Sequence, residues 1–197
     1  MPDTKFAEWF ADADMNDTAT VGGKGASLGE MFQKLSGIGV KVPNGFTLTT
    51  AAFKQFVEDE IPETTWNNIG APEGIEDLRN AAIKCSTLAS ALEVCLRDAD
   101  PKDHLNLNSR ASLARSLVRE TPVPDEIKVV IAQEYSKLCE LYHPGVDVAV
   151  RSSATTEDSA EASFAGQYES YLNVSGEQDI IEKWRRCVAS MFTERAI

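Results

Sequence analysis

A long helical segment in the middle of the sequence separates two regions in which only short strands are expected. Between residues 75 and 142, apolar side chains recur at the three- and four-residue spacing of amphipathic helices. Pro122 and Pro124 interrupt this spacing, because proline ends a helix. The expected strands cover residues 5–10, 46–48, 146–150 and 168–174. This order of elements predicts an α+β fold with a helical middle segment, about residues 75–142.

The first helix of the middle segment is expected to run from Ile75 to Cys95, with one apolar stripe along its length. Cys85 and Cys95 would then lie about 15 Å apart on the same helix, too far for a disulfide. The four cysteines include no C-x-x-C pair and the chain has only two histidines, so a structural zinc site is not expected. Reduced thiols are typical of cytoplasmic proteins, and we predict that location.

Composition and charge exclude several classes of protein. A hydrophobic content of 43% and a charged content of 25% are typical of globular chains. No apolar run approaches the roughly 20 residues of a membrane-spanning helix, so no membrane partner is expected. A net charge of -12 argues against nucleic acid as a partner. An anionic ligand would therefore need a few local basic side chains and backbone amides.

The run Val21-Gly22-Gly23-Lys24-Gly25 is expected to form a glycine-rich loop before a helix over residues 26–35. It is shorter than a P-loop and lacks the G-x-G-x-x-G pattern, so one interpretation is an ordinary tight turn with a solvated lysine. The functional interpretation is an anion site. Glycines let backbone N–H groups approach an anion, the following helix presents its positive end, and Lys24 adds a full charge.

Arg151 is the second candidate for binding an anion. It follows residues 146–150, which are expected to form a buried strand, and precedes a loop of serine, alanine and threonine. Its guanidinium could hold phosphate oxygens in bidentate fashion, or it could pair with Glu157 or Asp158 and fix the loop. The spacing leaves both interpretations open. The acids of this loop, Glu161 included, are more typical of a solvated surface than of a metal site.

Residues 168–174 are expected to form a regular strand in which alternate side chains share one face. Tyr168, Ser170, Leu172 and Val174 would lie on one face, and the residues between them on the other. An amphipathic helix follows from about Gln178 to the end of the chain. Its apolar stripe consists of Ile181, Trp184, Val188, Met191 and Phe192.

Three groups of residues carry a resemblance to a known family. They are Val21–Met31 with Val42–Phe46 and Thr49-Thr50, then Val148–Thr155 with Ser163–Gln167 and Tyr171–Val174, and finally Ser190–Ile197. In this order, they are similar to the amino-terminal region of the phosphoenolpyruvate synthase (pyruvate, water dikinase) family, from about residue 5 to residue 197. The resemblance implies an ATP-grasp-type nucleotide-binding domain of the pyruvate phosphate dikinase type, of which residues 1–197 would be the amino-terminal, incomplete part.

The resemblance also implies which residues bind ATP. Lys24 and Arg151 would contact its phosphates, and Gly166, Gln167 and Ser170 would lie in the nucleotide cleft. Ser170 replaces a threonine common in the family and keeps a hydroxyl for hydrogen bonding. The Mg²⁺ ligands and the phosphorylated histidine of the family would lie outside this chain, so no metal ligand and no catalytic residue is assigned here.

The implied activity of the complete enzyme is the conversion of pyruvate, ATP and water to phosphoenolpyruvate, AMP and phosphate through a phosphohistidine. The phosphohistidine and pyruvate-binding domains would be absent, so the chain alone is expected to be inactive and to lack a pyruvate site. Apolar surface left uncovered would favour self-association.

Three alternatives to this function remain open. Pyruvate, phosphate dikinases typically have Arg-Ser-Gly-Ala and a methionine-rich loop where this chain has Arg151-Ser152-Ser153-Ala154 and residues 163–166, which favours the enzyme that uses water. Rifampicin phosphotransferases share nearly all the motifs. A non-catalytic interaction module with the same fold is the third alternative.

Overall fold

The computed structural model describes residues 5–70, 74–155, 158–159, 162–163 and 168–197, and it confirms a mixed α+β chain. The helices are α1 (Thr18–Leu35), α2 (Thr50–Glu58), α3 (Glu63–Asn67), α4 (Glu76–Ala82), α5 (Leu88–Leu96), α6 (His104–Glu120), α7 (Asp125–Leu141) and α8 (Glu177–Ser190). The strands are β1 (Ala7–Trp9), β2 (Phe46–Leu48), β3 (Val148–Arg151), β4 (Asp158–Ser159), β5 (Ala162–Ser163) and β6 (Ser170–Val174). Two short 3-10 helices, Met15–Asp17 and Ser36–Ile38, flank α1.

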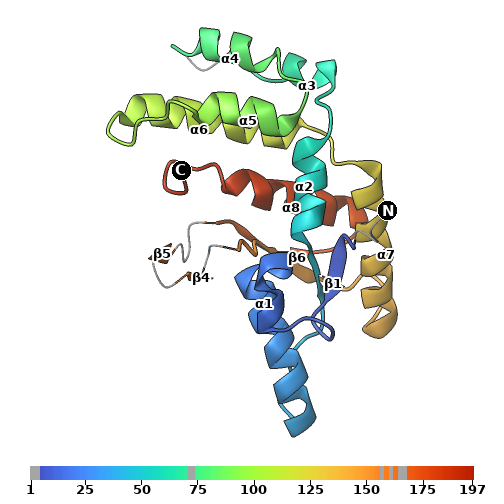
Figure 1. Ribbon diagram of the computed structural model, residues 1–197. Helices are drawn as coiled ribbons and strands as arrows, with labels where there is room; N and C mark the ends of the chain where they lie inside the picture. Colours follow the sequence, from blue (N-terminus) through green and yellow to red (C-terminus); the bar gives the residue numbers. More distant parts are fainter. Residues whose placement is uncertain (1–4, 71–73, 156–157, 160–161, 164–167) are drawn as a thin grey trace.

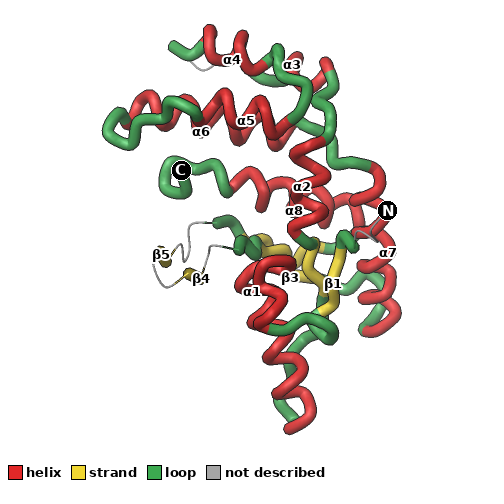
Figure 2. The backbone as a smooth tube through the Cα atoms, in the orientation of Figure 1, coloured by secondary structure: helices red, strands yellow, loops and turns green. Residues whose placement is uncertain are grey.

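Helix α8 lies between a helical layer and the strands. Helices α3 to α6 lie on one side of α8, and the strands and α1 lie on the other (Figure 1; Figure 2). The apolar face of α8 explains its central position, because Ile180, Val188 and Ala189 are all buried in the main core. Trp184 of α8 packs against Phe56 of α2, with ring centroids 5.4 Å apart. Burying α8 on both sides joins the helical layer to the strands.

The main core extends through the helical layer. Its fully buried large side chains include Leu88 of α5, Leu113 and Leu117 of α6, and Ile127 and Ile131 of α7. Burying side chains of this size contributes about 1.5–3 kcal/mol each to folding. No helix in the described part of the chain is both long enough and apolar enough to cross a membrane.

The prediction of one helix from Ile75 to Cys95 is wrong. Helix α4 ends at Ala82 and α5 begins at Leu88, with Cys85 in the turn between them. The break occurs because Thr87 caps α5: its hydroxyl accepts a hydrogen bond from the Ser90 amide, and the Ser90 hydroxyl accepts one from the Thr87 amide, both at 3.3 Å.

All four cysteines are free thiols, as predicted, with Cys95 buried.

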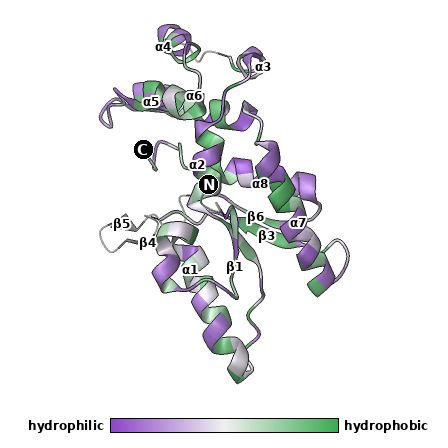
Figure 3. Ribbon diagram, turned by 45° about the vertical axis from the view of Figure 1, so that its right-hand side comes forward, coloured by the Kyte–Doolittle hydropathy of each residue, from purple (hydrophilic) through white to green (hydrophobic). Residues whose placement is uncertain are grey.

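The strands form short antiparallel pairs, β1 with β2, β3 with β6 and β4 with β5, among the described residues. In the first pair Ala7 lies opposite Leu48, and Trp9 lies opposite Phe46. Much of β3 and β6 has the hydrophobic colour in Figure 3, whereas hydrophilic residues dominate α4. The pairs β1–β2 and β3–β6 lie close to α8 and to the break in α1, and so position the site described below.

Residues 146–150 were predicted to form a buried strand, but β3 is covered on one face only. Val148 and Val150 are half-buried towards the core, but Ala149 and Arg151 on the other face are exposed. Only one face of β3 packs against the core, since its side chains alternate and α8 covers one side. Arg151 is therefore presented on the open face of the strand.

The regular alternation predicted for residues 168–174 is also wrong. Val148 pairs with Val174 and Val150 pairs with Tyr171, so β6 uses three residues where β3 uses two. This is a β-bulge, and Asn173 within it has a left-handed φ of 54°. The extra residue places Tyr171 and Val174 towards the core and leaves Leu172 70% exposed.

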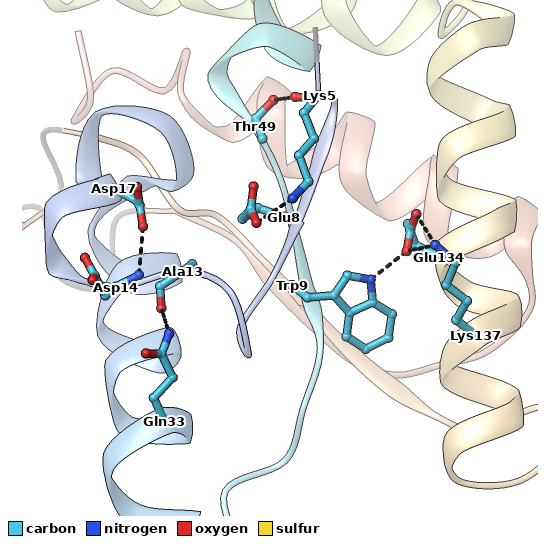
Figure 4. A network of polar contacts seen from close by, with 10 residues as sticks. All are labelled: Lys5, Glu8, Trp9, Ala13, Asp14, Asp17, Gln33, Thr49, Glu134 and Lys137. Atoms are coloured by element: carbon cyan, nitrogen blue, oxygen red, sulfur yellow. Dashed lines mark hydrogen bonds and ion pairs between the residues drawn. The ribbon is translucent and has the colours of Figure 1, made fainter. Parts of the chain in front are cut away.

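Strand β1 is attached to the elements on both sides of it (Figure 4). The Trp9 Nε1–H donates a hydrogen bond to the Glu134 carboxylate of α7 at 2.6 Å, and Lys137 pairs with the same carboxylate at 2.9 Å. The Thr49 hydroxyl, at the start of α2, donates to the Lys5 carbonyl at 2.8 Å. These contacts hold the β1–β2 pair against α7 and α2.

Candidate functional site

A cavity of about 740 Å³ lies where α1, β2, β3 and α8 meet. Lys24 of α1 and Arg151 at the end of β3 both line it, although 127 positions of sequence separate them. Residues 152–155 continue its wall after Arg151. The structure thus brings the two basic residues singled out from the sequence to one cavity.

The glycine run contacts the segment after Arg151 directly. The Ser153 hydroxyl donates a hydrogen bond to the Val21 carbonyl at 2.7 Å and accepts one from the Gly25 amide at 2.8 Å. The Gly23 amide donates to the Ala154 carbonyl at 3.2 Å. Three hydrogen bonds therefore join the two segments on which Lys24 and Arg151 lie.

The predicted glycine loop is instead a break within a helix. Helical structure extends from Thr18 to Leu35, and Gly22 interrupts it with φ 74° and ψ 170°, a conformation that is essentially limited to glycine. A Cβ at position 22 would lie 1.9 Å from the Ser153 carbonyl oxygen. The glycine at this position permits close packing against residue 153.

This packing corrects part of the anion-site interpretation. In that interpretation the backbone amides of the glycine run face an anion, but those of Gly23 and Gly25 donate to Ala154 and Ser153. Basic charge at this end of the cavity comes from the Lys24 and Arg151 side chains. Arg151 forms no ion pair with the side chains that the structure describes, and the Asp158 side chain is not among these, so the pairing with the loop acids stays a prediction. Glu157 lies outside the described residues.

Ser170 lies beside Arg151. The two residues pair across β3 and β6, and both are exposed, so their side chains share the open face of the strand pair. The other two residues assigned to the nucleotide cleft, Gly166 and Gln167, lie outside the described residues. The structure therefore brings Lys24, Arg151 and Ser170 to one region, with Ser170 adjacent to the cavity wall.

The rest of the cavity wall is mostly apolar, and Trp184, Val188 and Met191 contribute to it from α8 and the turn that follows. The sequence assigned these side chains to an apolar stripe without indicating that part of the stripe borders a cavity. Such a wall beside two basic residues can accept a ligand with one flat apolar part and one anionic part.

Cys187 lies in the same wall as a neutral thiol. Burial, together with the nearby Glu169 carboxylate, raises the pKa of Cys187 to about 12, and Lys24 acts in the opposite direction. The thiol donates weak hydrogen bonds to the carbonyls of Glu169 and Val150, with sulfur–oxygen distances of 3.5 and 3.8 Å. These contacts join α8 to the ends of β3 and β6 where Arg151 lies.

Sequence reasoning missed the role of Ser153. The spacing of Gly22 and Gly25 was a usable signal, because two glycines three residues apart on one helix face permit another chain to approach closely. Nothing in the sequence indicated which of Ser152 and Ser153 makes that approach.

In the described part of the chain, no group of three or more histidine, cysteine, aspartate or glutamate side chains could hold a metal ion.

A mixed α+β fold with a cavity that is basic at one end and apolar along its wall has the two features that a nucleotide site needs, basic groups for phosphate and apolar surface for a base. The chain belongs to the family of the pyruvate phosphate dikinase AMP/ATP-binding domain, whose model matches residues 18–197. This match confirms the family resemblance found in the sequence.

Relatives in three organisms are named phosphoenolpyruvate synthase. The chain is 40% identical to that of Synechocystis sp. over 99% of its own length, 38% identical to that of Pyrococcus furiosus over 98%, and 37% identical to that of Helicobacter pylori over 98%. It covers 21%, 24% and 21% of those proteins, respectively. The chain thus spans about a fifth to a quarter of the length of these relatives.

Proposed function

We propose that this chain is the ATP-binding part of a phosphoenolpyruvate synthase, an enzyme that converts pyruvate, ATP and water to phosphoenolpyruvate, AMP and phosphate through a phosphohistidine. The observation that carries the proposal is the shared cavity of Lys24 and Arg151 in a chain whose family binds AMP and ATP. The names of the relatives favour this enzyme over rifampicin phosphotransferases, pyruvate, phosphate dikinases and a non-catalytic module. An ATP-grasp-type fold is part of the proposal.

Lys24 and Arg151 would bind the triphosphate and neutralise its charge. A lysine supplies a mobile point charge, and an arginine supplies two parallel N–H donors to phosphate oxygens. Phosphoryl transfer depends mainly on such positioning and charge stabilisation. Ser170, opposite Arg151, has a hydroxyl on the same face and would hydrogen bond to the ligand. Gly166 and Gln167 are kept in the proposed site by family resemblance.

The apolar wall would hold the adenine base. Trp184 and Met191 present an aromatic ring and a thioether to the cavity, and both groups pack well against a flat heterocycle. Magnesium accompanies ATP in phosphoryl transfer. The described residues do not fit a magnesium site, and no step is assigned to that ion in this chain. Absence of turnover by this chain alone, self-association and a cytoplasmic location stay predictions.

Calorimetric titration with ATP tests the proposal. Lys24→Ala and Arg151→Ala should each weaken ATP binding about ten- to a hundredfold, because a charge-assisted hydrogen bond contributes about 1.5–3 kcal/mol. Lys102→Ala and Arg97→Ala make the same changes of charge in the helical layer, outside the cavity, and should leave the affinity within about twofold. Unchanged ATP binding by both Lys24→Ala and Arg151→Ala would show that the site is wrong.

A further inference from the structure

The two basic residues lie on separate segments, and one side chain links these segments through two hydrogen bonds. Lys24 lies between Gly23 and Gly25, whose amides donate to Ala154 and to the Ser153 hydroxyl. Arg151 lies two residues before Ser153 on the other segment. The backbone on both sides of Lys24 is therefore held by the segment that carries Arg151.

The Ser153 hydroxyl makes both kinds of hydrogen bond that a hydroxyl can make. It donates to the Val21 carbonyl at 2.7 Å and accepts from the Gly25 amide at 2.8 Å. These two groups lie on opposite sides of the break at Gly22. Ser153 therefore connects the two pieces of α1 as well as connecting α1 to the end of β3.

Close packing leaves little room for another arrangement of these segments. A Cβ at Gly22 would lie 1.9 Å from the Ser153 carbonyl oxygen and 2.6 Å from its hydroxyl oxygen. A Cβ at Gly25 would lie 2.8 Å from the Thr47 hydroxyl and 3.3 Å from the Ser153 hydroxyl. The serine thus lies close to both glycines, and the Thr47 side chain of β2 is also close to Gly25.

We propose that Ser153 is a positioning residue that holds Lys24 and Arg151 at the separation needed to bind one triphosphate together. The inference rests on the proposed function, because it assumes that both residues contact ATP. Ser153 acts through these residues and need not touch the nucleotide. Binding that depends on two charged groups is sensitive to their relative position, because a charge-assisted hydrogen bond weakens steeply when its distance or angle departs from the optimum.

Calorimetric titration of the whole chain with ATP in the presence of Mg²⁺ tests this inference through a double-mutant cycle. Ser153→Ala should weaken ATP binding about tenfold. In the otherwise unaltered chain, Arg151→Ala should weaken binding ten- to a hundredfold, whereas in the Ser153→Ala background it should weaken binding less than about threefold. This loss of effect is expected because an arginine that is no longer held in place contributes little.

Thr87→Ala is the matched control for lost stability. It removes a hydroxyl that accepts an amide hydrogen bond at the start of α5, in the helical layer and outside the cavity residues. Urea denaturation should show a loss of stability for it as well, with ATP affinity within about twofold of the unaltered chain. Should Ser153→Ala not fold, Ser153→Cys fills the site with a slightly larger side chain, weakens both hydrogen bonds, and should give the same cycle with a smaller effect.

The results separate failure of this inference from failure of the proposed function. If Arg151→Ala weakens ATP binding but Ser153→Ala behaves like Thr87→Ala, the positioning role is wrong and the proposed function stands. The same conclusion follows if the effects of Ser153→Ala and Arg151→Ala simply multiply. If the unaltered chain binds no ATP, or if Lys24→Ala and Arg151→Ala bind it unchanged, the proposed function fails and the positioning role fails with it.

Discussion

Gly22 lies so close to Ser153 that a Cβ on the glycine would be 1.9 Å from the serine carbonyl oxygen. The contact joins residues 131 positions apart and lies at the edge of the cavity that contains Lys24 and Arg151. Glycine at this place permits the backbone of one segment to lie against the backbone of another. The cavity thus depends on a close contact between two segments as well as on the charges of its side chains.

Gly22→Ala should lower the free energy of unfolding by at least about 2 kcal/mol, because it adds a steric overlap with backbone to a backbone conformation that side chains rarely adopt. Urea denaturation followed by circular dichroism would measure the loss. Gly37→Ala is the control, since a Cβ there meets nothing within 4 Å, and its effect should stay within about 0.5 kcal/mol. Equal stability of the two variants would contradict the close contact.

Sequence reasoning singled out Lys24 and Arg151 as candidates because residue type and neighbours carry that information, and the structure places both in the lining of one cavity. Glycines around a lysine, and an arginine before a run of small hydroxyl residues, are local features. The contact between the segments depends on the three-dimensional path of the chain, which those features do not contain. Consequently the anion-site interpretation of the glycine run directed its amides at a ligand, whereas residues 153 and 154 accept the hydrogen bonds of Gly23 and Gly25.

The errors in the fold have local causes that periodicity does not detect. The apolar spacing from Ile75 to Cys95 suits one helix, but the Thr87 and Ser90 hydroxyls begin a new one. The alternation of residues 168–174 suits a regular strand, but Asn173 accommodates a bulge. The strand expected at residues 46–48 matches β2, Phe46–Leu48, because no bulge interrupts its pairing with β1.

Asn173→Ala should lower the free energy of unfolding by about 1 kcal/mol, whereas Asn173→Gly should change it by less than about 0.5 kcal/mol. The left-handed φ of 54° is unfavourable for a residue with an ordinary Cβ, and asparagine and glycine tolerate it best. Position 173 is exposed, so lost packing does not explain a difference between the variants. Equal free energies of unfolding for Asn173→Ala and Asn173→Gly in chemical denaturation would contradict the left-handed conformation of the bulge.

Two buried thiols should make the chain less stable above pH 9. Burial raises the pKa of Cys95 and of Cys187 to about 12, from 9.0 in an unfolded chain. Below pH 9 both states hold the proton and stability is unaffected. Between pH 9 and about 12 only the unfolded state releases it, so each thiol lowers the free energy of unfolding by up to about 1.4 kcal/mol per pH unit.

Denaturation of Cys95→Ala over the same pH range isolates one of these contributions. Above pH 9 its free energy of unfolding should fall less steeply with pH than that of the unaltered chain. The difference between the two slopes should be up to about 1.4 kcal/mol per pH unit. In the folded chain at pH 8, iodoacetamide should modify Cys95 and Cys187 only after unfolding, which mass spectrometry of the peptides would show. Parallel pH profiles for the two chains would contradict the raised pKa of Cys95.

Trp184 should report nucleotide binding through its fluorescence. It lines the cavity and packs against Phe56 with ring planes at 55°, whereas Trp9 and Trp66 are absent from the described cavity lining. If adenine lies against this wall, ATP should change the emission of the chain, and Trp184→Phe should abolish the change and weaken binding about fivefold, equivalent to about 1 kcal/mol of aromatic stacking.

Single replacements of the other two tryptophans complete this experiment. Trp9→Phe and Trp66→Phe each leave Trp184 as the ring beside the ligand, so both should keep the ATP-dependent change of emission.

Phosphate contacts alone cannot produce this pattern, because Lys24 and Arg151 would bind inorganic triphosphate equally well without a base. Inorganic triphosphate should therefore bind through the same two residues and leave the Trp184 emission nearly unchanged. An equal change of emission with ATP and with inorganic triphosphate would contradict the placement of adenine against α8.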